Sequence, residues 1–142
     1  MEVKERSEIQ QQYKWDLTSL FESDEKWEEK LSSLKGQQQV ALSYQGKLDN
    51  AQTIYQYLKW DYSITSDLSD LFCYASLRHS EDTRDSNATS MYSRIYSLYV
   101  EISSASAFAR PEILSLQDDK LKAIIEDDQL KDYRFMLEDL YR

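Results

Sequence analysis

The sequence has 142 residues, a formal net charge of −9 and a pI near 4.6, and its length suits a single domain. Hydrophobic residues make up 41% and aromatic residues 13% of it, too many for a disordered chain. The negative charge makes nucleic acid and anionic membranes poor partners, because both are themselves negatively charged.

The first 22 residues are predicted to form an N-terminal extension with one short turn. Residues 1–14 are polar and rich in glutamine. Asp16 is a candidate cap for the turn that follows. The apolar anchors of this turn are Trp15, Leu17, Leu20 and Phe21.

The first helix is predicted to begin after Ser23, because a serine followed by Asp24 and Glu25 is a typical N-cap with first-turn acids. Its buried face carries Trp27, Leu31, Leu34 and Ala41. Gly36 weakens the middle of this helix, and Gly46 is a candidate C′ residue at its end.

Two long helices follow, each with apolar residues at steps of three and four. The first is expected over residues 51–78, capped by Asp49 or Asn50, with Asp61 as the one interruption of its apolar face. The second is expected to start at a Thr83 cap and to run for about 26 residues, or roughly 39 Å. Pro111 is predicted to end it and to open a short turn through Leu114.

The last part of the sequence predicts two shorter helices. One is capped by Asp118 and points Leu121, Ile124 and Ile125 inward, and the other starts near Asp128. The second of these carries Leu130, Tyr133, Leu137 and Leu140, and its apolar pattern is still running at Arg142. This indicates a cut chain. We therefore expect that apolar face to lack a partner and the isolated chain to form homo-oligomers.

Together these elements predict an all-α fold without a sheet. Two glycines and one proline are too few for the many tight turns of a β sandwich. We expect an antiparallel bundle of about four to five helices, two of them long, that occupies residues 23–142 as one lobe.

No metal site is predicted. His79 and Cys73 are the only residues of their types, whereas a zinc site needs three or four ligands. The acidic run over residues 81–87 lacks the spacing and the glycine of a calcium-binding loop.

A cysteine–histidine catalytic pair is not expected either. Six positions along a helix correspond to about 600°, so Cys73 and His79 point in different directions. Cys73 lies between Phe72 and Tyr74, and we predict that it is buried and inert.

The other candidate groups are interpreted as structural. The adjacent carboxylates are expected on solvated faces, and the stripe of Tyr92, Tyr96 and Tyr99 in the core or at a contact between lobes. The prediction for this chain is therefore no catalytic, no cofactor-binding and no metal-binding residue. A single cysteine, no membrane-length apolar run and no secretion signal favour a cytoplasmic protein.

Several segments in order resemble the oligoendopeptidase F family, bacterial relatives of thimet oligopeptidase. The resemblance covers residues 13–142. The matching segments are Trp15-Asp-Leu-Thr-Ser-Leu-Phe-Glu-Ser-Asp-Glu-Lys-Trp27, Tyr44-Gln-Gly-Lys-Leu48, Tyr74-Ala-Ser-Leu-Arg78 with Glu81-Asp-Thr83, Pro111-Glu-Ile-Leu114 and Tyr133-Arg-Phe-Met-Leu-Glu-Asp-Leu-Tyr-Arg142.

The resemblance implies a parent zinc endopeptidase that cleaves oligopeptides in the cytoplasm. This chain would be its N-terminal helical lobe, which lines one side of an enclosed substrate channel, and its partners would be the parent's own C-terminal catalytic domain and the peptide substrate. In the family, the zinc-binding His-Glu-x-x-His helix lies far downstream, so no catalytic residue is carried over. The alternative is a stand-alone acidic helical module for protein–protein interaction.

Overall fold

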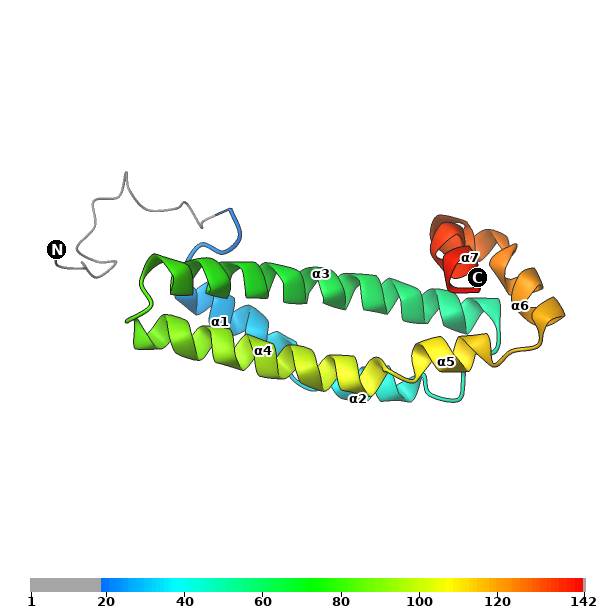
Figure 1. Cartoon of the computed structure of the whole chain (residues 1–142), viewed down its shortest axis with the longest axis horizontal. Helices are drawn as coiled ribbons and strands as arrows, with labels where there is room; N and C mark the ends of the chain where they lie inside the picture. Colours follow the sequence, from blue (N-terminus) through cyan, green and yellow to red (C-terminus); the bar gives the residue numbers. More distant parts are fainter. Residues whose placement is uncertain (1–18, 142) are drawn as a thin grey trace. The chain divides into compact units, whose positions relative to one another are not determined.

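The computed structural model describes residues 19–141, with side chains to Leu140. The described chain is helical and contains no strand (Figure 1). The all-α prediction with two long helices is confirmed. In chain order the helices are α1 (Asp24–Ser33), α2 (Gln37–Ser43), α3 (Ala51–Glu81), α4 (Ser86–Ser106), α5 (Ala109–Leu114), α6 (Asp118–Ile125), the 3-10 helix η3 (Asp128–Tyr133) and α7 (Arg134–Tyr141).

The long helices α3 and α4 each contribute to two compact units. The described part of unit 1 comprises residues 19–35 and 65–100, and that of unit 2 comprises residues 36–64 and 101–141. The predicted division at residue 22 stays a prediction, and the predicted turn residues Trp15, Asp16 and Leu17 lie outside the described residues.

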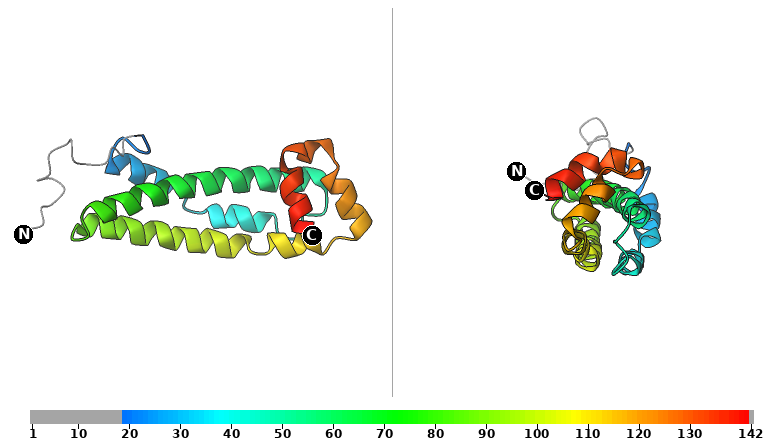
Figure 2. Two further views of the ribbon diagram at one scale, coloured as in Figure 1. Left: turned by 45° about the horizontal axis from the view of Figure 1, so that its top comes forward. Right: turned by 90° about the vertical axis from the view of Figure 1, so that its right-hand side faces the viewer.

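In unit 1, α1 packs against the second half of α3 and the first part of α4 (Figure 2). The predicted cap is confirmed, because Ser23 accepts a hydrogen bond from the backbone N–H of Lys26 at 3.3 Å. Trp27 is fully buried, and its indole N–H donates to the carbonyl oxygen of Leu71 at 2.9 Å. The other buried apolar residues of this unit are Leu31, Leu34, Leu68, Tyr74, Ala75, Ala88, Met91, Ile95 and Leu98.

The turn between α3 and α4 differs from the prediction. Helix α3 is capped by Asn50, as one of the two predicted alternatives, but it continues to Glu81. Thr83 is not the cap of α4, since the Asp85 carboxylate accepts from the backbone N–H groups of Asn87 and Ala88 at 2.9 and 3.2 Å. A carboxylate satisfies two free N–H groups and complements the positive end of the helix dipole.

The predicted first helix is interrupted at Gly36, because α1 ends at Ser33 and α2 begins at Gln37 in unit 2. Gly36 has φ = 90°, a left-handed conformation that only glycine adopts without strain. Gly46 also has a positive φ, of 79°, but it lies two residues beyond the Tyr44 C-cap of α2 and not directly after it.

The helix break associated with Pro111 lies earlier in the chain than predicted. Helix α4 ends at Ser106, and Pro111 lies in the first turn of α5. A proline lacks the N–H that would bond to the carbonyl four residues earlier, and its ring clashes with that carbonyl. Continuation of α4 through Ala107 is therefore disfavoured, and the helix is interrupted there.

The core of unit 2 includes the C-terminal helices. Leu121, Ile124 and Ile125 are buried as predicted, although Gln117, and not Asp118, occupies the N-cap position of α6. The cluster comprises Leu48, Ile54, Tyr57, Leu58, Ala109, Ile113, Leu121, Ile124, Ile125, Leu130 and Leu137.

The prediction that the apolar face of the last helix lacks a partner is wrong. Leu130 and Leu137 are 0% and 2% exposed, and Tyr133 and Leu140 pack against the same core, because α7 folds back onto α5 and α6. The basis for the predicted homo-oligomer is thereby removed. Phe135 and Met136 are the exposed large hydrophobic residues in the described part of α7, at 81% and 45%.

Candidate functional site

The charged corner between α3 and α4 is organised around Arg78, which is buried. Its guanidinium donates to the Asp24 carboxylate at 3.1 and 2.7 Å and to Asp85 at 3.0 Å. The hydroxyl of Tyr74 and the amide of Asn87 also donate to Asp24, at 2.7 and 3.3 Å. The first residue of α1 is thus tied to both long helices within unit 1.

Electrostatics hold this cluster in its charged form. The hydrogen bond from Arg78 to Asp24 is the largest cause of a raised Arg78 pKa, which outweighs the opposing effect of burial. Burial by itself would raise the pKa of Asp85, but the hydrogen bonds from Arg78 and from the backbone of Ala88 and Asn87 lower it below its usual value. The guanidinium between two carboxylates links α1, α3 and the start of α4.

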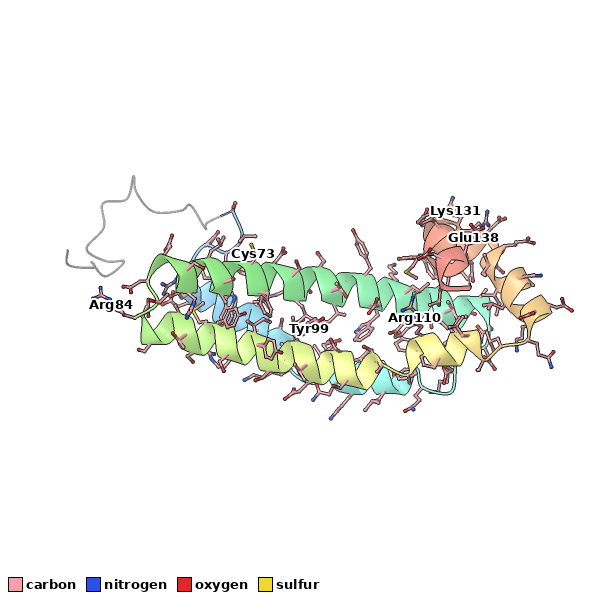
Figure 3. The ribbon with its side chains drawn as sticks, viewed as in Figure 1. Cys73, Arg84, Tyr99, Arg110, Lys131 and Glu138 are labelled. Atoms are coloured by element: carbon pink, nitrogen blue, oxygen red, sulfur yellow. The ribbon has the colours of Figure 1, made fainter. Side chains whose placement is uncertain are left out.

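Cys73 and His79 lie on different sides of α3. Cys73 is exposed, so the prediction that it is buried is wrong. Its neighbours Phe72 and Tyr74 pack towards other parts of unit 1, because adjacent helical residues point about 100° apart. The ring of His79 lies 5.8 Å from that of Tyr92, and Cys73 lies on the edge of α3 away from α4 (Figure 3).

The acidic corner residues bind arginines. Asp85 pairs with Arg78, and Asp82 with Arg84 at 3.4 Å. Among residues 19–141, no group of three histidine, cysteine, aspartate or glutamate side chains is arranged to hold a metal ion. The zinc implied by the family resemblance therefore has no matching ligand set in the described part of this chain.

The three tyrosines of the predicted stripe are partly exposed, and their rings lie close to the same ring of α3. Tyr92, Tyr96 and Tyr99 are 37%, 53% and 48% exposed, and their rings surround Phe72 at centroid distances of 5.2, 6.4 and 6.5 Å. Together with His79 they form five rings from two helices, called the aromatic cluster below. Sequence periodicity found the stripe on α4, but the contribution of α3 depends on how the two helices face each other.

An open cavity of about 430 Å³ lies in unit 2. Its walls come from α3, the end of α4, α5 and α7, and they are mainly apolar, with Arg110 and Asp139 as the charged residues. Figure 3 shows Arg110 on α5. The lining residues are Tyr57, Leu58, Ser106, Ala107, Ala109, Arg110, Ile113, Met136, Leu137, Asp139 and Leu140. No local sequence pattern predicts this cavity, because its walls come from segments that are far apart in the chain.

Burial perturbs two titratable groups of α3 in unit 2. It raises the pKa of Tyr57 to about 12, and the charge of Asp61 adds to the effect. Burial also raises the pKa of Asp61 itself, the predicted interruption of the apolar face. A hydrogen bond between Tyr57 and Ser106 opposes the rise in the Tyr57 pKa, and both residues line the cavity.

The described residues thus form an all-α fold. No helix within residues 19–141 is both long and apolar enough to cross a membrane.

Comparison with known proteins gives this domain a family. The family Oligopeptidase F matches residues 112–142. Oligopeptidase PepF of Bacillus subtilis is 33% identical across 98% of this chain, and the chromosomal oligoendopeptidase F of Lactococcus lactis subsp. cremoris is 35% identical across 98%. A solved chain from Chlamydophila abortus, described as a peptidase, superimposes on 99% of this chain with a TM-score of 0.91 and 27% identity.

These similarities identify the chain as an N-terminal region of an oligoendopeptidase F-like peptidase. The chain spans only 21% and 24% of the length of the two curated relatives and 24% of the solved chain.

Proposed function

We propose that this chain is the N-terminal helical lobe of a zinc metalloendopeptidase that hydrolyses oligopeptides in the cytoplasm. The supporting observation is the pattern of coverage. Relatives named oligopeptidase or oligoendopeptidase match 98% of this chain, yet the chain accounts for only 21% and 24% of their length. The catalytic residues would lie in the part of the parent protein that this chain does not cover.

The chain itself is proposed to be non-catalytic. Its sequence has one histidine and cannot supply the two histidines of a His-Glu-x-x-His helix. In the parent protein, a zinc ion bound by such a helix would polarise the peptide carbonyl and activate water. The residues of this lobe would contribute shape and support to that chemistry.

The lobe is further proposed to line one side of the substrate channel. Within unit 1, the second half of α3 and the first part of α4 are tied together at their corner by the Arg78 cluster. A tied pair of helices of this kind would suit a channel wall that admits short peptides and excludes folded proteins.

The parent reading frame and two purified proteins test the proposal. We expect the frame to continue beyond this chain into a His-Glu-x-x-His motif. The full-length protein should contain one zinc per chain and cleave oligopeptides, whereas the 142-residue chain should do neither. A frame without that motif, or peptide cleavage by the 142-residue chain, would contradict the proposal.

A substrate pair tests the channel separately. The full-length protein should cleave a short peptide but not the same sequence placed within a folded domain. Equal cleavage of both would argue against an enclosed channel while leaving the peptidase assignment intact. Fractionation of cells that express the full-length protein would test the cytoplasmic location.

A further inference from the structure

The aromatic cluster lies on a part of the α3–α4 hairpin that α1 does not use. Helix α1 contacts α3 through Trp27, which bonds to the Leu71 carbonyl, and α4 through Glu28, which pairs with Arg94 at 2.6 Å. These contacts come from other sides of both long helices. Tyr99 of the cluster lies between α3 and α4 (Figure 3). Within unit 1, one side of the hairpin is therefore covered by α1, and the side with the aromatic cluster is not.

The part of this face formed by Phe72 and the three tyrosines has no charged residue at the neighbouring helical positions. Helical neighbours lie three and four positions away, and around Phe72 and Tyr96 none of these positions is charged, in a sequence with 30% charged residues. The neighbours of Phe72 are Leu68, Ser69, Ala75 and Ser76, and those of Tyr96 are Tyr92, Ser93, Tyr99 and Val100. Contiguous exposed aromatic surface without charge is typical of an interaction site, and tyrosine suits one because its ring is apolar and its hydroxyl can hydrogen-bond.

We propose that the aromatic cluster is the surface through which this lobe packs against the remainder of the parent peptidase. This inference rests on the proposed function. The relatives support it, because more than three quarters of their length lies outside the region matched by this chain. The contacting surface should be apolar and uncharged, with hydrogen-bond acceptors for the tyrosine hydroxyls.

Two other occupants fit the face less well. A second copy of this chain would bring together two molecules with a net charge of −9 each, and their repulsion opposes association. A free oligopeptide carries charged termini, and the face offers no opposite charge to bind them. The rest of the parent chain is covalently attached, so its packing requires no association of two acidic molecules and no binding of charged peptide termini.

Tyrosine nitration measures whether the face is covered. Tetranitromethane modification of Tyr96 and Tyr99, located by mass spectrometry, should be at least about tenfold slower in the full-length protein than in the 142-residue chain, because close packing excludes the reagent. Equal rates in the two proteins would overturn the proposal. So would rates in the full-length protein that fall only when an oligopeptide is added, since the face would then be a substrate surface.

A pair of lysine substitutions gives an independent measurement. Ser97 is exposed and lies on α4 about 100° away from Tyr96. In the 142-residue chain, Tyr96→Lys and Ser97→Lys should have equally small effects on the melting temperature. In the full-length protein, Tyr96→Lys should lower it by several degrees and Ser97→Lys should not. Equal effects in the full-length protein would overturn the proposal.

The outcomes separate this inference from the function it rests on. A full-length protein that binds zinc and cleaves peptides, but in which Tyr96 and Tyr99 react freely, would refute only the packing face. A parent frame without a zinc-binding motif would refute the proposed function. Nitration would then still show whether the rest of that protein covers the cluster. Concentration-dependent protection in the 142-residue chain would indicate a second copy and overturn the proposal.

Discussion

Replacing Arg78 by methionine should destabilise the chain strongly. The substitution removes three hydrogen bonds to Asp24 and Asp85, of 3.1, 2.7 and 3.0 Å, and leaves two carboxylates facing each other without their shared cation. Breaking a buried ion pair costs about 3–5 kcal/mol. The carboxylates are 29% and 22% exposed and can partly regain water. We therefore expect a loss near the lower end, about 3 kcal/mol in the free energy of unfolding.

A second arginine in the same unit provides the matched control. Arg94 pairs with Glu28, but the two side chains are 41% and 40% exposed, and Arg94 also lies over the Trp27 ring at 5.4 Å. Exposed pairs contribute about 0.2–1 kcal/mol, so Arg94→Met should cost at most about 1 kcal/mol. Urea unfolding followed by circular dichroism compares the two variants. Equal losses, or a loss below about 1 kcal/mol for Arg78→Met, would refute the reasoning.

The same cluster predicts a pH dependence. The pKa of Asp85 is lower in the folded chain than in the unfolded chain. Its stabilising contribution is therefore fully present above the ordinary aspartate pKa of about 4 and is lost as pH falls through the lowered value. Arg78→Met removes the main hydrogen bond that lowers this pKa, so the variant should lose less stability than the parent chain on acidification. A steeper acid loss in the variant would contradict this account.

Three further predictions concern other contacts. Trp27→Phe removes the buried hydrogen bond to α3, of 2.9 Å, and should lower the unfolding free energy by about 1–3 kcal/mol, measured by urea unfolding. Glu112 accepts the backbone N–H groups of Gly46 and Leu48; Glu112→Ala should speed hydrogen exchange at both amides, and unchanged exchange would show that these bonds do not protect them. Tyr57 has a pKa raised to about 12, so its contribution to stability should be present below pH 10 and decline as pH rises towards 12. Tyr57→Phe should remove that part of the alkaline loss, which denaturant unfolding at pH 9 to 12 would detect.

The sequence was most informative where local periodicity and burial agree. The apolar steps of three and four located α3 and α4, and Ser23 and Asn50 cap their helices as two of the predicted candidates. These features depend on residues within one or two turns of each other. The ordered segments resembling oligoendopeptidase F led to the family that the comparisons support, because such segments are a property of the sequence itself.

Predictions of caps and breaks were less accurate, because several neighbouring residues compete for each role. Thr83 and Asp85 are both reasonable caps, and the Asp85 carboxylate is the one that also reaches Arg78. Cys73 lies in an apolar run and is nevertheless exposed, because a helix presents adjacent residues to different sides and the packing partners decide which side is buried.

The sequence by itself determined an acidic, helical chain and its family, since charge, helical period and ordered motifs are written along the chain. Only the tertiary structure decided which distant groups meet. It brought Asp24 within hydrogen-bond distance of Arg78, 54 residues away, and it gathered Phe72 and three tyrosines into one uncharged aromatic face. It also folded α7 back onto α5 and α6, burying the face that the sequence pattern left open. Each of these depends on the direction in which whole helices face each other, and helical periodicity carries no information about that direction.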